Sequence, residues 1–179
     1  MAEQVQLHDK VFKKFIDKAA LQEATQKVGE KMNAELSDKN PLFLVVLNGA
    51  FVFASDLLRT FRYDCDISFI KLSSYVGTKS THTVREVIGL DTNVKDRTVV
   101  LIEDIIDTGI TMDHIIEQMK LLEAKEVKTA TMLFKPQAIE KDFPIDYIGL
   151  EIPNDFIVGY GLDYNGKGRN LPDIYKIIE

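Results

Sequence analysis

Cysteine is nearly absent from this sequence, and Cys65 is the only one among 179 residues. An intrachain disulfide and a metal site made of several thiolates are therefore excluded, and a reducing cytoplasm fits this composition. The three histidines, His8, His82 and His114, lie far apart in the sequence. Each is expected to be a surface residue, because isolated histidines do not make a metal site.

The sequence also lacks a hydrophobic run long enough to span a membrane. Its longest apolar stretch, residues 41–54, is interrupted by Asn48 and Gly49, whereas a spanning helix needs about 20 apolar residues. Residues 1–4 have neither the basic start nor the apolar centre of a signal peptide. We therefore expect no membrane association and a cytoplasmic location.

Basic residues are outnumbered by acidic ones, with 22 Lys and Arg against 28 Asp and Glu and a net charge of -6. Non-specific binding to nucleic acid depends on basic side chains that neutralise phosphates. Nucleic acid is therefore not an expected partner. The length of 179 residues suits one domain with a proper core, so a single domain over residues 1–179 is predicted.

The most informative stretch runs from Val99 to Thr111. Residues 99–102 are apolar and mostly β-branched, which is typical of a strand buried on both faces. Glu103 and Asp104 follow directly, so we expect them at the carboxyl end of that strand. Open α/β sheets bind their ligands at this end of their strands.

A donor-rich turn over residues 107–111 comes next, and apolar residues from Met112 to Leu122 then recur at helical spacing. A turn that leads into a helix N-terminus presents free backbone N–H groups and the positive end of the helix dipole, which suit a phosphate. Thr108 and Thr111 add hydroxyl donors, and Gly109 lets the backbone approach a ligand closely. Acids on one side and a phosphate cradle on the other predict a site for a sugar phosphate.

Other interpretations of this stretch fit less well. Asp-Thr-Gly also opens the active-site loop of aspartic proteases, but those have Ser or Ala where Ile110 stands here, in all-β surroundings. A Gly-x-x-x-x-Gly-Lys-Ser/Thr phosphate loop is absent from the sequence. A plain solvated turn gives no reason for three acids within residues 103–107.

The run Glu-Asp-Ile-Ile-Asp-Thr-Gly over residues 103–109 resembles the 5-phosphoribosyl-1-pyrophosphate (PRPP) signature of the type I phosphoribosyltransferases. It is most similar to the hypoxanthine-guanine branch. Further motifs match in order along the chain at Leu47–Ala50, Ser74-Tyr75, Lys135 and Phe156–Arg169. The resemblance covers most of the chain from residue 42 onward.

The apolar periodicity predicts helices over residues 18–36, 51–61 and from 112 to about 124. It predicts further strands over residues 42–47, 67–72, 84–90, 127–134 and 145–151, while residues 1–16 fit either a strand or a helix. Residues 171–178 are expected to close the domain. The resemblance implies an α/β fold, in which a mostly parallel central sheet is flanked by helices. It also implies a core of about residues 41–145 and a small hood made of about residues 1–40 and 146–179.

The resemblance implies a purine-salvage enzyme that joins hypoxanthine or guanine to PRPP with Mg²⁺ and yields IMP or GMP and pyrophosphate. Asp107 is the expected catalytic proton acceptor. The groups expected to bind the ribose and 5′-phosphate of PRPP are Glu103, Asp104, Asp107, Thr108, Gly109, Ile110 and Thr111. Those expected at the pyrophosphate are Asn48, Gly49 and Arg169, and those at the purine are Lys135, Phe156, Ile157 and Asp163. Magnesium is expected at Asp163, Glu103 and Asp104, and a lid at Ser74 and Tyr75.

Several of these residues also have plain structural interpretations. Lys135 could be a snorkelling surface residue at the end of a strand, Phe156 could be ordinary core packing, and Asp163 could be a turn acid. Gly49 could simply start a helix, and residues 73–83 could be an ordinary hairpin tip rather than a lid.

Two positions depart from the pattern of some relatives, which carry a Lys where Asn48 stands and a basic residue where Ile110 stands. Uncharged backbone donors would have to suffice at both. Two other functions stay open, namely a xanthine-accepting enzyme and a non-catalytic regulator that senses PRPP or nucleotides on the same fold. Small-molecule substrates are the expected ligands, and the resemblance implies a homo-oligomer, either a dimer or a tetramer.

Overall fold

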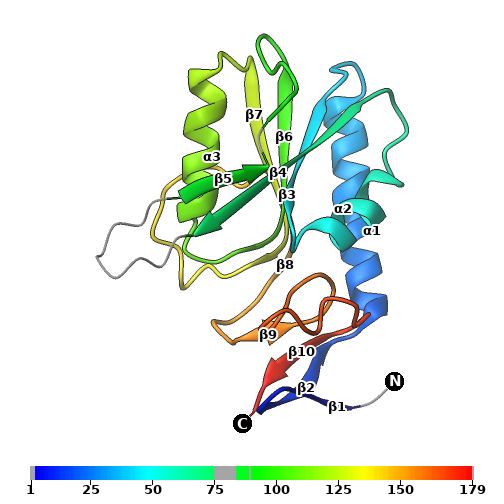
Figure 1. Cartoon of the computed structure of the whole chain (residues 1–179). Coiled ribbons are helices and arrows are strands. Elements are labelled where there is room, and N and C mark those ends of the chain that lie inside the picture. The colour runs from blue at the N-terminus through cyan, green and yellow to red at the C-terminus, as the bar shows by residue number, and fades with distance from the viewer. Residues whose placement is uncertain (1–2, 75–83, 89, 179) are drawn as a thin grey trace.

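The computed structural model describes residues 3–74, 84–88 and 90–178. Its larger sheet has six strands in the order β5-β4-β3-β6-β7-β8 (Figure 1). Five of them run parallel to one another, namely β4, β3, β6, β7 and β8. The edge strand β5 is antiparallel to β4. The strands are β3 Leu42–Leu47, β4 Asp66–Ser74, β5 Val84–Ile88, β6 Thr98–Ile106, β7 Glu126–Phe134 and β8 Tyr147–Glu151. The predicted mostly parallel α/β sheet is confirmed.

Helices cover both faces of this sheet. Helices α1 (Lys18–Leu36) and α2 (Phe51–Leu58) share one apolar core with the sheet, and α3 (Ile110–Leu121) shares a second core on the other face. Figure 1 shows α3 on one side of the strands and α1 with α2 on the other. The range predicted for α1 is confirmed, whereas α2 and α3 each end about three residues early. Leu122, predicted to continue the buried stripe of α3, lies beyond the helix and is half exposed.

Residues 4–16, whose structure the sequence left open, form two strands of a second sheet. This antiparallel sheet has the order β1-β2-β10-β9 and consists of β1 Gln4–Leu7, β2 Lys10–Ile16, β9 Ile157–Val158 and β10 Ile174–Ile177. Figure 1 shows it below the large sheet. The predicted boundary of the hood needs correction, because α1 packs on the large sheet and β8 is one of its strands. We use "small sheet" below for the four strands alone.

Polar contacts fix the small-sheet region against the large one. The buried carboxylate of Asp173 accepts a hydrogen bond from the N–H of Lys18 at 2.8 Å, where α1 begins. The hydroxyl of Tyr160, which lies just after β9, donates to Asp56 of α2 at 2.8 Å. The loop after β9 is therefore anchored to the helices that cover the sheet.

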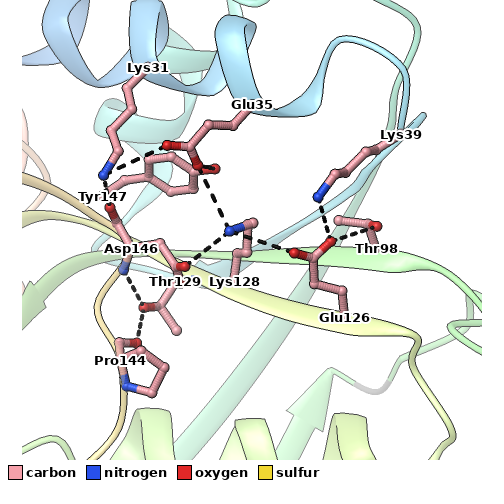
Figure 2. A network of polar contacts seen from close by, with 10 residues as sticks. All are labelled: Lys31, Glu35, Lys39, Thr98, Glu126, Lys128, Thr129, Pro144, Asp146 and Tyr147. Atoms are coloured by element: carbon pink, nitrogen blue, oxygen red, sulfur yellow. Dashed lines mark hydrogen bonds and ion pairs between the residues drawn. The ribbon is translucent and has the colours of Figure 1, made fainter.

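A polar network joins α1 to the beginnings of the strands β6, β7 and β8 (Figure 2). Tyr147 is almost fully buried and donates its hydroxyl to Glu35 at 2.9 Å. Burial and the Glu35 carboxylate raise the pKa of this phenol. Lys128 lies within 4.0 Å of carboxylate oxygens of Glu35, Glu126 and Asp146. These contacts occupy the amino ends of the strands and leave the opposite edge of the sheet for the predicted site.

The predicted lid falls mostly outside the described residues. Strands β4 and β5 pair antiparallel up to Ser74 and Val84, so the arms of the predicted hairpin are confirmed. Tyr75 and the rest of residues 75–83 lie outside the described part of the chain. In the part that is described, none of the helices has the length and apolar character needed to cross a bilayer.

Candidate active site at the end of strand β6

Two adjacent carboxylates are buried near the end of the central strand. Strand β6 continues to Ile106, so Glu103 and Asp104 lie within its last four residues, at the carboxyl end. Their side chains are paired with backbone donors, since Glu103 accepts from the N–H of Asp104 and Asp104 accepts from that of Ile105. The pairing of β6 with β7 continues past both acids, whereas its pairing with β3 ends at Ile102.

Burial raises the pKa of both carboxyl groups, because removal from water penalises the charged form. The neighbouring charge of Asp104 raises the pKa of Glu103 further. At Asp104 the charge of Arg169 acts in the opposite direction. A cation or a ligand rich in hydroxyl groups would favour the charged forms of this buried pair.

The turn between β3 and α2 lies directly against these acids. A β-carbon added to Gly49 would stand 1.7 Å from Oδ2 of Asp104, so this position accepts only glycine. Asn48 is exposed beside it, and the Leu47–Asn48 peptide bond is cis. The glycine therefore brings a backbone segment into contact with the carboxylates, which supports a ligand-binding role for the turn over a simple helix start.

The loop after β9 meets the same turn. A β-carbon on Gly161, whose φ is 104°, would lie 2.0 Å from the carbonyl oxygen of Gly49. Arg169 donates to the Gly161 carbonyl at 2.7 Å, and its other terminal nitrogen lies 2.7 Å from Oδ1 of Asp163. The structure thus gathers Gly49, Asp104, Asp163 and Arg169 around one point, as expected of groups that would share a pyrophosphate.

The predicted magnesium ligands do not form one cluster. Within the described residues, no three side chains of His, Cys, Asp or Glu are close enough together to hold an ion. Asp163 is paired with Arg169 and also accepts from the N–H of Gly166, whereas Glu103 and Asp104 form their own pair. Magnesium commonly uses one or two carboxylates together with substrate oxygens and water, and either group of acids could serve in that way.

The phosphate turn is shorter than predicted. Helix α3 begins at Ile110, so the turn comprises residues 107–109, and Ile110 and Thr111 belong to the first turn of the helix. Gly109 is the N-cap residue with a φ of 81°, and no side chain caps the helix there. The N–H of Ile110 makes one long hydrogen bond, 3.5 Å, to Oγ1 of Thr108. The start of a helix presents N–H groups of the kind that bind an anion.

A cavity of about 240 Å³ opens at this point. It is lined by Glu103, Asp104, Ile105, Ile106, Asp107, Thr108, Gly109, Thr111 and Met112. Both predicted halves of the sugar-phosphate site, the acids and the phosphate turn, therefore face one cavity. The side chain of Ile110, a residue predicted to bind the phosphate, is not part of this lining.

Lys135 follows β7 and is buried, with 6% of its surface exposed. The surface interpretation of this residue was wrong. Its ammonium group donates to Oδ2 of Asp107 at 2.9 Å, and its backbone N–H donates to the carbonyl of Ile106. This ion pair could not be predicted, because the two residues follow different strands that only the parallel pairing of β6 and β7 brings together.

The residues predicted to stack on and read a purine lie on the small-sheet side. Phe156 is 49% exposed, which contradicts a core-packing role, and its ring packs against Phe12 and Tyr164. Ile157 is buried in β9. Among the described residues, no hydrogen bond, ion pair or ring contact joins Phe156 to Lys135 or Asp107.

Known proteins resemble this chain in both sequence and fold. Residues 15–165 match the model of the phosphoribosyl transferase domain. The chain is 38% identical over 168 residues to the hypoxanthine-guanine phosphoribosyltransferase of Bacillus subtilis, and the alignment covers 93% of each protein. A crystal structure of a hypoxanthine-guanine phosphoribosyltransferase from Bacillus anthracis superimposes with a TM-score of 0.87 at 33% identity, over 95% of this chain and 99% of that one.

Some relatives are much longer than this chain. The bifunctional protein TilS/HprT of Listeria innocua is 40% identical over 169 residues, which are 94% of this chain but 26% of that protein. The chain therefore spans about a quarter of the length of such bifunctional relatives.

The raised pKa of Glu103 predicts a specific dependence of stability on pH. Below the ordinary value of 4.5 the group is protonated in both the folded and the unfolded state. As the pH rises above it, the unfolded state ionises first, so folding stability is lost until the raised folded pKa is passed. Glu103→Gln removes this loss, and its melting temperature is expected to fall less than that of the wild type between pH 5 and pH 8.

Glu117→Gln, which alters an exposed carboxyl on α3, is the matched control and should follow the wild type. If the melting temperatures of the wild type and Glu103→Gln changed with pH in the same way, Glu103 would not have the raised pKa that its burial predicts.

Proposed function

This chain belongs to the phosphoribosyl transferase domain family, and from that premise we propose that it transfers the 5-phosphoribosyl group of PRPP to N9 of hypoxanthine or guanine. Pyrophosphate and IMP or GMP are the products, as purine salvage requires. The observation that carries the proposal is the single cavity shared by the buried acids of β6 and the phosphate turn. The pyrophosphate-binding groups lie directly against one of those acids.

The cavity suits PRPP because it can hold the sugar at both ends. The N–H groups at the start of α3 and the hydroxyls of Thr108 and Thr111 would bind the 5′-phosphate. Glu103 and Asp104 would accept further hydrogen bonds from the ribose hydroxyls. The backbone of residues 48–49 and the guanidinium of Arg169 would bind the pyrophosphate.

The reaction forms a bond from N9 to C1 of the ribose while the bond from C1 to the pyrophosphate oxygen breaks, and its electron pair leaves with the pyrophosphate. Positive charge builds on the ribose during this exchange, and the nearby carboxylates of Glu103 and Asp104 stabilise it. Asp107, at the mouth of the phosphate turn, would accept the proton from purine N7 and so make N9 a better nucleophile. Holding both substrates in one cavity supplies the orientation.

Magnesium, when bound with PRPP, would neutralise charge on the leaving pyrophosphate. The carboxylate of Asp163 fits this use, because it lies with Arg169 and Gly161 beside the pyrophosphate turn. Glu103 and Asp104 fit a second ion held together with the ribose hydroxyls.

Base choice would rest on Lys135. Its ammonium group has only donors, so it can bind the 6-oxo group of hypoxanthine or guanine, and it cannot bind the 6-amino group of adenine. Before a base arrives, this ammonium pairs with Asp107. A 6-oxopurine would therefore bind between the two residues, with its oxygen at Lys135 and N7 at Asp107. Phe156 would stack on the ring, and the Ile157 carbonyl would contact the other edge. A homo-oligomer in the cytoplasm stays a prediction of the family resemblance.

Turnover by the purified wild type with PRPP, Mg²⁺ and each of hypoxanthine, guanine, xanthine and adenine tests the proposal. We expect nucleotide formation with hypoxanthine and guanine and none with adenine. Efficient use of xanthine would favour the xanthine-accepting alternative. No turnover with any base, together with tight PRPP binding, would favour the non-catalytic sensor.

Replacement of Asp107, the proposed proton acceptor, is the second test. Asp107→Asn should keep the fold and PRPP binding but lower kcat by about 100-fold or more, because the amide cannot accept the N7 proton. Asp64→Asn, an exposed change before β4, is the matched control and should not alter kcat. Turnover of guanine by Asp107→Asn at a rate near that of the wild type would remove Asp107 from the role.

Lys135→Ala tests base selection. Loss of the ammonium donor should lower the ratio of kcat/KM for hypoxanthine to that for adenine by roughly tenfold or more, since a hydrogen bond to a charged group contributes about 1.5–3 kcal/mol. Lys125→Ala, an exposed lysine before the other end of β7, should leave the ratio unchanged. An unaltered base preference in Lys135→Ala would reject the assignment.

A further inference from the structure

The segment of residues 135–143 after β7 contacts the phosphate turn at successive residues. The backbone N–H of Lys135 donates to the carbonyl of Ile106 at 3.0 Å, and its ammonium group donates to Asp107 at 2.9 Å. The N–H of Glu140 donates to the carbonyl of Thr108 at 2.9 Å. Each of the three residues before Gly109 is therefore hydrogen-bonded to this segment, which we call the buttress segment.

Gly109 itself is covered by two apolar side chains of the buttress segment. A β-carbon on Gly109 would lie 2.7 Å from Cδ1 of Ile139 and 2.9 Å from Cε1 of Phe143. One turn further along α3, Lys141 pairs with Asp113 at 3.0 Å. The segment therefore touches both the turn and the start of the helix, and Ile139, Lys141 and Phe143 are not among the residues that line the 240 Å³ cavity.

This contact matters because the turn contains a glycine, and its internal side-chain hydrogen bond, from the N–H of Ile110 to Oγ1 of Thr108, is long at 3.5 Å. Gly109 has a left-handed backbone and no side-chain cap, and glycine is the residue with the greatest conformational freedom. A phosphate binds well only when the N–H groups are already aimed at it, since any ordering on binding reduces the affinity. Ile139 and Phe143 pack close to Gly109 and restrict the positions that its backbone can take.

We propose that the buttress segment positions the 5′-phosphate turn, with Phe143 and Ile139 as its positioning residues. The inference rests on the proposed function, since it concerns the way the same cavity binds PRPP. Because Lys135 begins the same segment, the residue that reads the base and the side chains that hold the phosphate turn form one continuous piece of chain.

The test compares Phe143→Ala with Ile145→Ala. Ile145 is partly buried in the same core cluster as Phe143, so its truncation controls for a general loss of packing. The affinity for PRPP with Mg²⁺ and no base is measured by calorimetry, and KM for PRPP and for guanine by initial rates. Phe143→Ala should weaken PRPP binding and raise its KM by roughly tenfold or more, since small misplacements of a binding group are costly. Its KM for guanine should change much less.

Phe143→Leu should restore most of the PRPP affinity, because it again covers Gly109. Ile145→Ala should bind PRPP like the wild type even if its melting temperature falls as far. Should Phe143→Ala fold poorly, Ile139→Ala tests the same contact with Gly109 and should also weaken PRPP binding.

Equal weakening of PRPP binding by Phe143→Ala and Ile145→Ala, or unchanged binding in Phe143→Ala and Ile139→Ala, would overturn the positioning role while wild-type turnover still upheld the enzyme. A wild-type protein that neither binds PRPP nor turns it over would overturn both proposals.

Discussion

The burial of two adjacent carboxylates in the central strand is the physical constraint on which the rest of the site depends. Charged groups taken from water without a partner are costly, and burial raises the pKa of both Glu103 and Asp104. Backbone N–H groups and the charge of Arg169 offset part of that cost. A ligand that brings hydroxyl donors or positive charge would offset the remainder, as the proposed binding of PRPP at this strand end requires.

Glycine allows the other segments to reach these acids. Gly49 has no room for a side chain because of Asp104, and Gly161 has none because of the Gly49 carbonyl. Two loops from distant parts of the chain therefore converge on β6. Tyr160 anchors the later loop to α2, so the fold fixes the relative positions of the groups that would bind the two ends of PRPP.

Local signals in the sequence predicted much of this fold. Helix α1 was predicted with its correct bounds, since its apolar positions repeat regularly. The turn predicted after β6 leads into helix α3, and its role in binding phosphate stays a prediction. The sequence did not show that β6 extends through residues 103–106, because two adjacent carboxylates are unusual inside a buried strand. Strand β2 was left open, since its partner β10 lies more than 150 residues later in the chain.

The contacts between segments could not be predicted. The pairing of Lys135 with Asp107, and that of Ile139 and Phe143 with Gly109, depend on the parallel alignment of β6 and β7. A pattern within one segment carries no information about a partner on another. The sequence therefore offered candidate groups for the site, and the structure shows which of them lie near each other.

A crystal structure of the protein with ribose 5-phosphate and Mg²⁺ tests the central claim most directly. The account predicts that the phosphate lies within hydrogen-bonding distance of the N–H groups at residues 108–111, with the ribose hydroxyls at Glu103 and Asp104. A sugar phosphate bound elsewhere on the protein, with the cavity at the end of β6 left empty, would contradict it.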